Sequence, residues 1–152
     1  MRDLDELRRQ LMRATLEHVA FDGWTRQSMN AAADELGLDR REAESAFPGG
    51  PAEVIELFSR EADLAMLAEF EQRDTAAMRV RDQVALAARI RLEQNEDDRE
   101  ALRRAMSFLA QPQHHLLGLR LLHETCDACW VAAGDGSADY NYYTKRGLLS
   151  GV

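Results

Sequence analysis

No segment of this sequence alternates apolar and polar residues with a period of two, because its apolar residues recur at spacings of three and four. That spacing is the period of an amphipathic α-helix, and its consistent use leaves no candidate for a β-strand. The three prolines and nine glycines fall between the periodic stretches. The pattern predicts an all-α protein of roughly eight helices. The first predicted helical stripe consists of Leu4, Leu7, Leu11, Ala14, His18 and Phe21.

Capping residues predict where individual helices begin. Asp3 with Glu6, and Asp39 with Glu42, have the spacing of capping boxes, and Ser28 is predicted to cap the second helix. Pro51 suits the first position of a long helix, because its missing N–H needs no partner there. The predicted helices cover 4–21, 28–36, 39–46, 51–70, 78–94, 98–110 and 115–132, and the eighth begins after a turn near residue 136.

Length and charge limit the classes of protein to consider. A chain of 152 residues suggests one compact unit, in which we expect an N-terminal part over 1–50 and a ligand-binding helical part over 51–152. The net charge of −8 disfavours a nucleic-acid partner and strong electrostatic binding of anionic lipid by the body of the protein. The sequence has no apolar run of transmembrane length, and its charged start resembles no signal peptide, so we expect a cytoplasmic protein.

The sequence contains no constellation that we interpret as catalytic, and we expect no metal and no cofactor. His123, Cys126 and Cys129 recur every three residues, but no second pair completes the four ligands of a structural zinc site. We therefore interpret both cysteines as small buried residues. Asp135 begins a segment that imitates a calcium loop but lacks its glycine and its final glutamate.

The most specific segment runs from Trp130 to Leu149 and reads WVAAGDGSADYNYYTKRGLL. It joins the end of an apolar helix to a tight turn and a basic, tyrosine-rich helix start. Gly134 and Gly136 suit positive φ angles in that turn. Ser137 or Asp139 is predicted to cap the next helix. The segment resembles the signature of a family of accessory proteins of ubiquinone biosynthesis. That family is the ninth member of the coenzyme Q set.

That resemblance implies a fold like that of TetR proteins and a function without catalysis. Such a protein holds an isoprenoid lipid or quinone in an apolar tunnel and presents it to the di-iron demethoxyubiquinone hydroxylase. A protein carrier for such a lipid is physically reasonable, because each CH₂ of a polyprenyl tail costs about 0.8 kcal/mol to hydrate, so the tail does not leave the bilayer unaided. Members of the family continue with an amphipathic membrane-binding helix, which we do not expect in a chain that stops at Val152. Peripheral contact with the inner membrane through such a helix, and homodimer formation, remain open.

The resemblance and the surplus of apolar residues on the middle helices together predict two sets of site residues. One is a partner-binding patch for the hydroxylase, formed by Asp127, Trp130 and Val131. Trp130 fits an exposed anchor and a core residue about equally well. The other set is predicted to line the lipid tunnel: Leu57, Phe58, Met66, Val84, Met106 and Leu122.

Residues 5–58 have the spacing of a helix-turn-helix module of the TetR type, with Gly37 and Leu38 in the turn and Phe47 anchoring the third helix. The alternative function is accordingly a ligand-responsive transcriptional repressor. The positive charge that DNA binding requires is missing, since residues 28–53 carry two arginines and six acids, a sum of −4. Acids facing phosphates repel them, so we expect the module to serve packing and not DNA binding.

Overall fold

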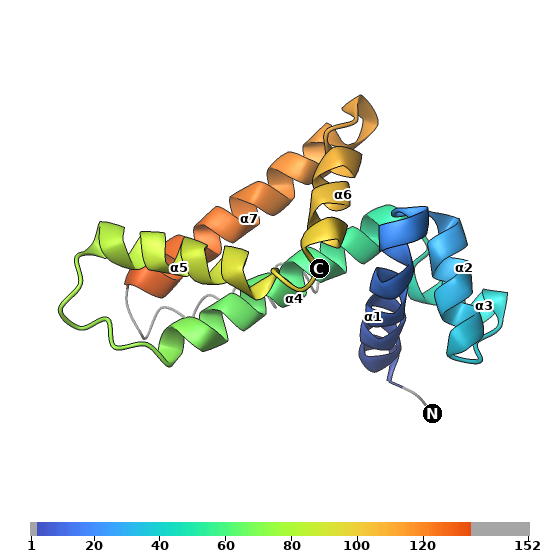
Figure 1. Cartoon of the computed structure of the whole chain (residues 1–152), viewed down its shortest axis with the longest axis horizontal. Helices are drawn as coiled ribbons and strands as arrows, with labels where there is room; N and C mark the ends of the chain where they lie inside the picture. Colours follow the sequence, from blue (N-terminus) through green and yellow to red (C-terminus); the bar gives the residue numbers. More distant parts are fainter. Residues whose placement is uncertain (1–2, 135–152) are drawn as a thin grey trace. The chain divides into compact units, whose positions relative to one another are not determined.

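The computed structural model describes residues 3–134, and all of its regular elements are helical (Figure 1). The predicted all-α class is therefore confirmed for this part of the chain, which contains seven α-helices and one short 3₁₀ helix. The predicted eighth helix and its caps Ser137 and Asp139 lie outside the described residues. The elements are α1 Leu4–Asp22, α2 Arg26–Glu35, α3 Arg40–Ala46, α4 Pro51–Glu71, α5 Val80–Gln94, α6 Arg99–Leu109, η1 Pro112–His114 and α7 His115–Gly134.

The chain divides into two compact units, neither of which is continuous in sequence. Unit 1 comprises Met1–Arg60 and Asp97–Leu119, and unit 2 comprises Glu61–Glu96 and Arg120–Val152. The predicted division into an N-terminal part over 1–50 and a ligand-binding part over 51–152 concerns function and not compactness, and it stays a prediction.

In unit 1, α1 packs against α2, α3 and α6. The predicted apolar stripe of α1 is partly wrong, because Leu4 is 54% exposed and Phe21 is 86% exposed. A helix turns by about 100° per residue, so the strict alternation of threes and fours drifts around the helix, and Phe21 lies about 100° away from Leu4. The face that is buried consists of Leu7, Leu11, Met12, Thr15 and Val19.

The predicted helix caps are confirmed in one case and corrected in two. Asp39 and Glu42 form the complete capping box, with Glu42 N–H donating to the Asp39 carboxylate at 2.8 Å. Asp3 caps α1 but accepts from Asp5 N–H, while the Glu6 side chain binds Arg9 and Gln10, so there is no box.

The second correction concerns Ser28, which lies inside α2 and does not cap it. Thr25 is the cap, because its hydroxyl accepts from Ser28 N–H at 3.2 Å. The Ser28 hydroxyl is buried and donates to the Gly23 carbonyl at 2.6 Å, which ties α2 to the end of α1.

The turn between α2 and α3 is as predicted. Gly37 has φ 71°, a left-handed conformation that favours glycine, and Leu38 and Phe47 are buried on either side of α3. The Arg8 guanidinium lies 5.0 Å from the centre of the Phe47 ring, which fastens α1 to the end of α3. The relation of this three-helix arrangement to TetR proteins stays a prediction.

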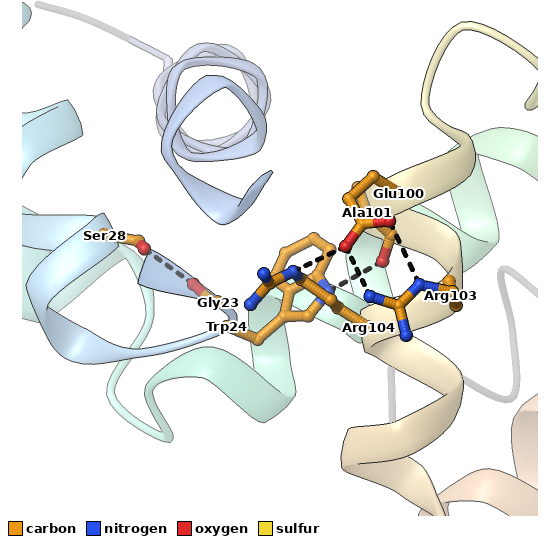
Figure 2. A network of polar contacts seen from close by, with 7 residues as sticks. All are labelled: Gly23, Trp24, Ser28, Glu100, Ala101, Arg103 and Arg104. Atoms are coloured by element: carbon orange, nitrogen blue, oxygen red, sulfur yellow. Dashed lines mark hydrogen bonds and ion pairs between the residues drawn. The ribbon is translucent and has the colours of Figure 1, made fainter. Parts of the chain in front are cut away.

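Trp24 connects the first helices of unit 1 to α6 (Figure 2). Its indole N–H donates to the Ala101 carbonyl at 3.0 Å, and the centroids of the Trp24 and Phe58 rings are 5.7 Å apart. Beside it, Glu100 accepts from Arg103 and Arg104. These two hydrogen bonds lower the pKa of Glu100 to about 2, and the bond from Arg103 has the larger effect.

Unit 2 has its own apolar core, contributed by α4, α5 and α7. Val84 and Leu86 pack against its edge. The three helices thereby bury their apolar faces against one another. The buried members are Met66, Leu67, Phe70, Ala87, Ile90, Ala128, Cys129 and Ala132.

Candidate functional site

The second half of α7 has one face in the core of unit 2 and an opposite face in solvent. Ala128, Cys129 and Ala132 belong to the core cluster. Asp127 and Trp130 are exposed, and Val131 is half-buried. The two faces follow from helix geometry, since a rotation about the helix axis of about 100° separates Trp130 from Cys129 and one of about 200° separates it from Ala128.

Trp130 is 58% exposed, so the structure places it on the surface and not in the core. Asp127 lies three residues earlier and therefore shares its face of the helix. Exposed tryptophans are uncommon and are enriched among the residues that dominate protein interfaces. The arrangement thus combines a large aromatic ring with a neighbouring carboxylate on a rigid helix. Its use in binding a partner stays a prediction.

The six predicted tunnel residues are distributed over both units. Met66 is fully buried in unit 2, and Val84 packs against the same cluster. In unit 1, Leu57 is half-buried and Phe58 is buried beside Trp24. The structure therefore brings Met66 and Val84 together and places Phe58 in another core. A tunnel lined by the six residues stays a prediction.

Two residues of this set have unexpected positions for apolar side chains. Met106 is 65% exposed on α6, and Leu122 is 61% exposed on α7. Both were selected from the resemblance and the surplus of apolar residues on the middle helices, and such a surplus does not show which face of a helix is covered.

Unit 2 also contains a polar cluster that was not predicted from the sequence. The Arg91 side chain donates to the Asp63 carboxylate at 2.9 Å, and the Thr125 hydroxyl donates to the same oxygen at 2.8 Å. The side chains of Arg91 and Asp63 are only 11% and 8% exposed. One signal was present, because Asp63 stands at helical spacing from Leu67 and Phe70 and so places an acid on an apolar stripe.

The two cysteines differ in environment. Cys129 is buried, as predicted, but Cys126 is exposed, because one position faces the core and the other does not. Burial raises the pKa of the Cys129 thiol, which disfavours its reactive thiolate form. Among residues 3–134, no three His, Cys, Asp or Glu side chains are placed to hold a metal ion together. The segment that begins at Asp135 lies outside the described residues.

Comparison with known proteins points to one family. The family model described as COQ9 matches residues 116–152. The chain is 31% identical over 160 residues to the rat protein "Ubiquinone biosynthesis protein COQ9, mitochondrial", with 97% of this chain and 49% of the rat protein covered. The human protein of the same name is 30% identical over 160 residues, with 97% and 48% covered. The Drosophila melanogaster protein is 30% identical over 147 residues, with 94% and 45% covered.

The chain spans about half the length of the curated relatives that it matches. Those relatives are named as mitochondrial proteins. Within the described residues, no helix has both the length and the apolar character needed to cross a membrane.

Proposed function

This chain belongs to the COQ9 family of ubiquinone biosynthesis proteins, and from that premise we propose that it is a non-enzymatic accessory protein of the pathway. It binds an isoprenoid lipid or quinone intermediate and presents it to the di-iron hydroxylase that acts on demethoxyubiquinone. The names of the relatives support the pathway, and they support no particular lipid or partner.

The observation that carries the proposal is the exposure of Trp130 beside Asp127 on α7. A tryptophan turned outward from a well-packed helix loses the hydrophobic stabilisation that burial would provide. Docking on a partner recovers it. The family model covers this helix from residue 116 onward, so the exposed aromatic lies in the part of the chain that the family model matches.

The proposed ligand is supported by the apolar surface of the middle helices. Unit 2 is built around a cluster of apolar and small residues that includes the fully buried Met66, and methionine adapts to ligands of irregular shape. A ligand with a long isoprenoid tail requires such a lining, because the tail is costly to hydrate. Mass spectrometry of lipids that co-purify with the protein tests this part. Only polar or no lipids in the sample would contradict it.

The partner surface is tested with Trp130→Lys and a pull-down of the hydroxylase. Loss of a central aromatic anchor is worth about 2 kcal/mol or more, which weakens binding roughly thirtyfold. Because Trp130 is exposed, the melting temperature should remain nearly unchanged.

Leu92→Lys is the matched control, because Leu92 is 67% exposed on α5 and the substitution adds the same charge. It should bind the hydroxylase as the unmodified chain does. Equal pull-down by Trp130→Lys and Leu92→Lys would refute the assigned surface.

The repressor remains the alternative function. The exposed residues of α3 include two acids, Glu42 and Glu44, beside Arg40 and Arg41, and no observation favours DNA over the proposed partner.

A further inference from the structure

α7 carries the two cysteines of the chain three residues apart, one in solvent and one in the core of unit 2. Cys126 is exposed, whereas Cys129 is only 5% exposed and belongs to the core cluster. Both are free thiols. Both were predicted to be buried, and two buried thiols would be inert. The exposure of Cys126 instead pairs a thiol that reagents can reach with a second thiol, one helical turn away, that they cannot reach.

The spacing brings the two thiols close to disulfide geometry. Residues three apart in an α-helix have Cα atoms about 5 Å apart, inside the range of about 4.4–6.8 Å found in disulfides. Their Cβ atoms are about 5–6 Å apart, whereas a disulfide holds them at about 3.5–4.5 Å. The bond between Cys126 and Cys129 therefore requires a distortion of this helical turn by roughly 1 Å. A disulfide that strains its backbone is easily reduced, which is typical of regulatory disulfides.

The turn between the two cysteines adjoins both the polar cluster and the exposed surface of unit 2. Directly before it, the Thr125 hydroxyl donates to the buried Asp63 carboxylate at 2.8 Å. Asp127 lies inside the turn, and Trp130 follows it directly. Burial, and to a smaller extent nearby negative charges that include Asp63, raises the pKa of the Cys129 thiol. A distortion of this turn therefore acts on the buried cluster and on the surface at the same time.

We propose that Cys126 and Cys129 form a reversible disulfide that acts as a redox switch in α7. In the reduced chain, the helix is regular through this turn, as the structure describes it. In the oxidised chain, the distorted turn weakens the hydrogen bond from Thr125 to Asp63 and changes the orientation of Trp130. Formation of the disulfide is independent of the proposed function, whereas its effect on hydroxylase binding rests on that function.

The oxidant is a low-molecular-weight disulfide such as glutathione disulfide. The exposed Cys126 thiolate attacks one of its sulfur atoms, the S–S bond breaks, and one glutathione leaves as a thiolate. The Cys129 thiolate then attacks Cys126 Sγ, and the second glutathione leaves. Two protein thiols are thereby oxidised, and one disulfide is reduced to two thiols that take up the two protons released by the cysteines. Because burial raises the pKa of Cys129, its thiolate is scarce and the second step is the slower one.

The proposal is tested by equilibrating the full chain in glutathione buffers of increasing disulfide content. After acid quenching and alkylation with iodoacetamide under denaturing conditions, intact-mass spectrometry counts the free thiols. We expect a monomeric species that has lost two hydrogen atoms and regains two alkylated thiols after treatment with dithiothreitol. Its melting temperature should be at least roughly 2 °C below that of the reduced chain, because the disulfide strains α7. Two free thiols at every ratio, a glutathione adduct as the end product, or equal melting temperatures would overturn the proposal.

Single substitutions separate the roles of the two thiols. Cys129→Ser should stop at a glutathione adduct on Cys126, because no second thiol displaces the glutathione. Cys126→Ser should keep its remaining thiol unmodified, because Cys129 is buried. Modification of Cys126→Ser at the rate of the parent chain would contradict the assignment of Cys126 as the entering thiol.

A pull-down of the hydroxylase tests the effect on the partner surface. The reduced chain should retain at least roughly fivefold more hydroxylase than the oxidised chain, because Trp130 changes its orientation. Cys126→Ser is the matched control and should bind equally in both buffers. Equal binding by the reduced and the oxidised parent would refute the switch. Failure of the reduced parent to bind, with the disulfide and the lower melting temperature observed, would refute the proposed function and leave the disulfide standing.

Discussion

At the scale of single residues, the most consequential contact in unit 2 is the buried pair of Asp63 and Arg91. The two side chains are almost fully withdrawn from water, and Thr125 adds a second hydrogen bond to the same carboxylate oxygen. Removing charges from water is costly, so such a pair contributes little net stability but becomes a liability when one partner is lost. The hydrogen bonds also link three helices, because α4 contributes Asp63, α5 contributes Arg91 and α7 contributes Thr125.

We predict that Arg91→Ala lowers the free energy of unfolding by about 3 kcal/mol, because it leaves a buried carboxylate without its ionic partner. Urea denaturation followed by circular dichroism measures the change. Arg103→Ala is the control, since its contact with Glu100 is exposed and screened by solvent, so we expect it to change the free energy of unfolding much less. Equal destabilisation by the two variants would show that the pair in unit 2 is not effectively buried.

At the scale of elements, the capping box of α3 shows how local chemistry defines a short helix. α3 has seven residues, too few to be stable alone, and the side chains of Asp39 and Glu42 satisfy backbone N–H groups at its start. Both residues were identified from spacing alone, because the partners are three positions apart in the chain.

We predict that Asp39→Ala destabilises the protein by about 1 kcal/mol through loss of the cap. Ser45→Ala, an exposed change in the same helix, should change stability by no more than about 0.5 kcal/mol. Thermal unfolding of both variants provides the comparison. An Asp39→Ala protein as stable as Ser45→Ala would mean that tertiary contacts of Ala43 and Ala46, and not the cap, define the helix.

At the scale of the whole molecule, the distribution of charge separates the two candidate functions. The chain carries 27 acids against 19 bases, and the predicted DNA-reading part, 28–53, is itself negative. We predict no salt-sensitive retardation of duplex DNA in an electrophoretic shift experiment, because phosphate contacts require clustered positive charge. Submicromolar binding that weakens steeply as salt is raised would contradict this and favour the repressor.

The sequence by itself determined the helical class, most helix bounds and the capping box of α3, because each of these depends on residues three or four positions apart. Pro51 at the start of α4 and Gly37 in the turn after α2 are examples. Only the tertiary structure decided which faces are covered. It turned Trp130 and Leu122 outward, and it joined Asp63 to Thr125 across 62 residues. The reason is physical: helical hydrogen bonds close within one turn, whereas burial depends on distant segments whose approach no local spacing records.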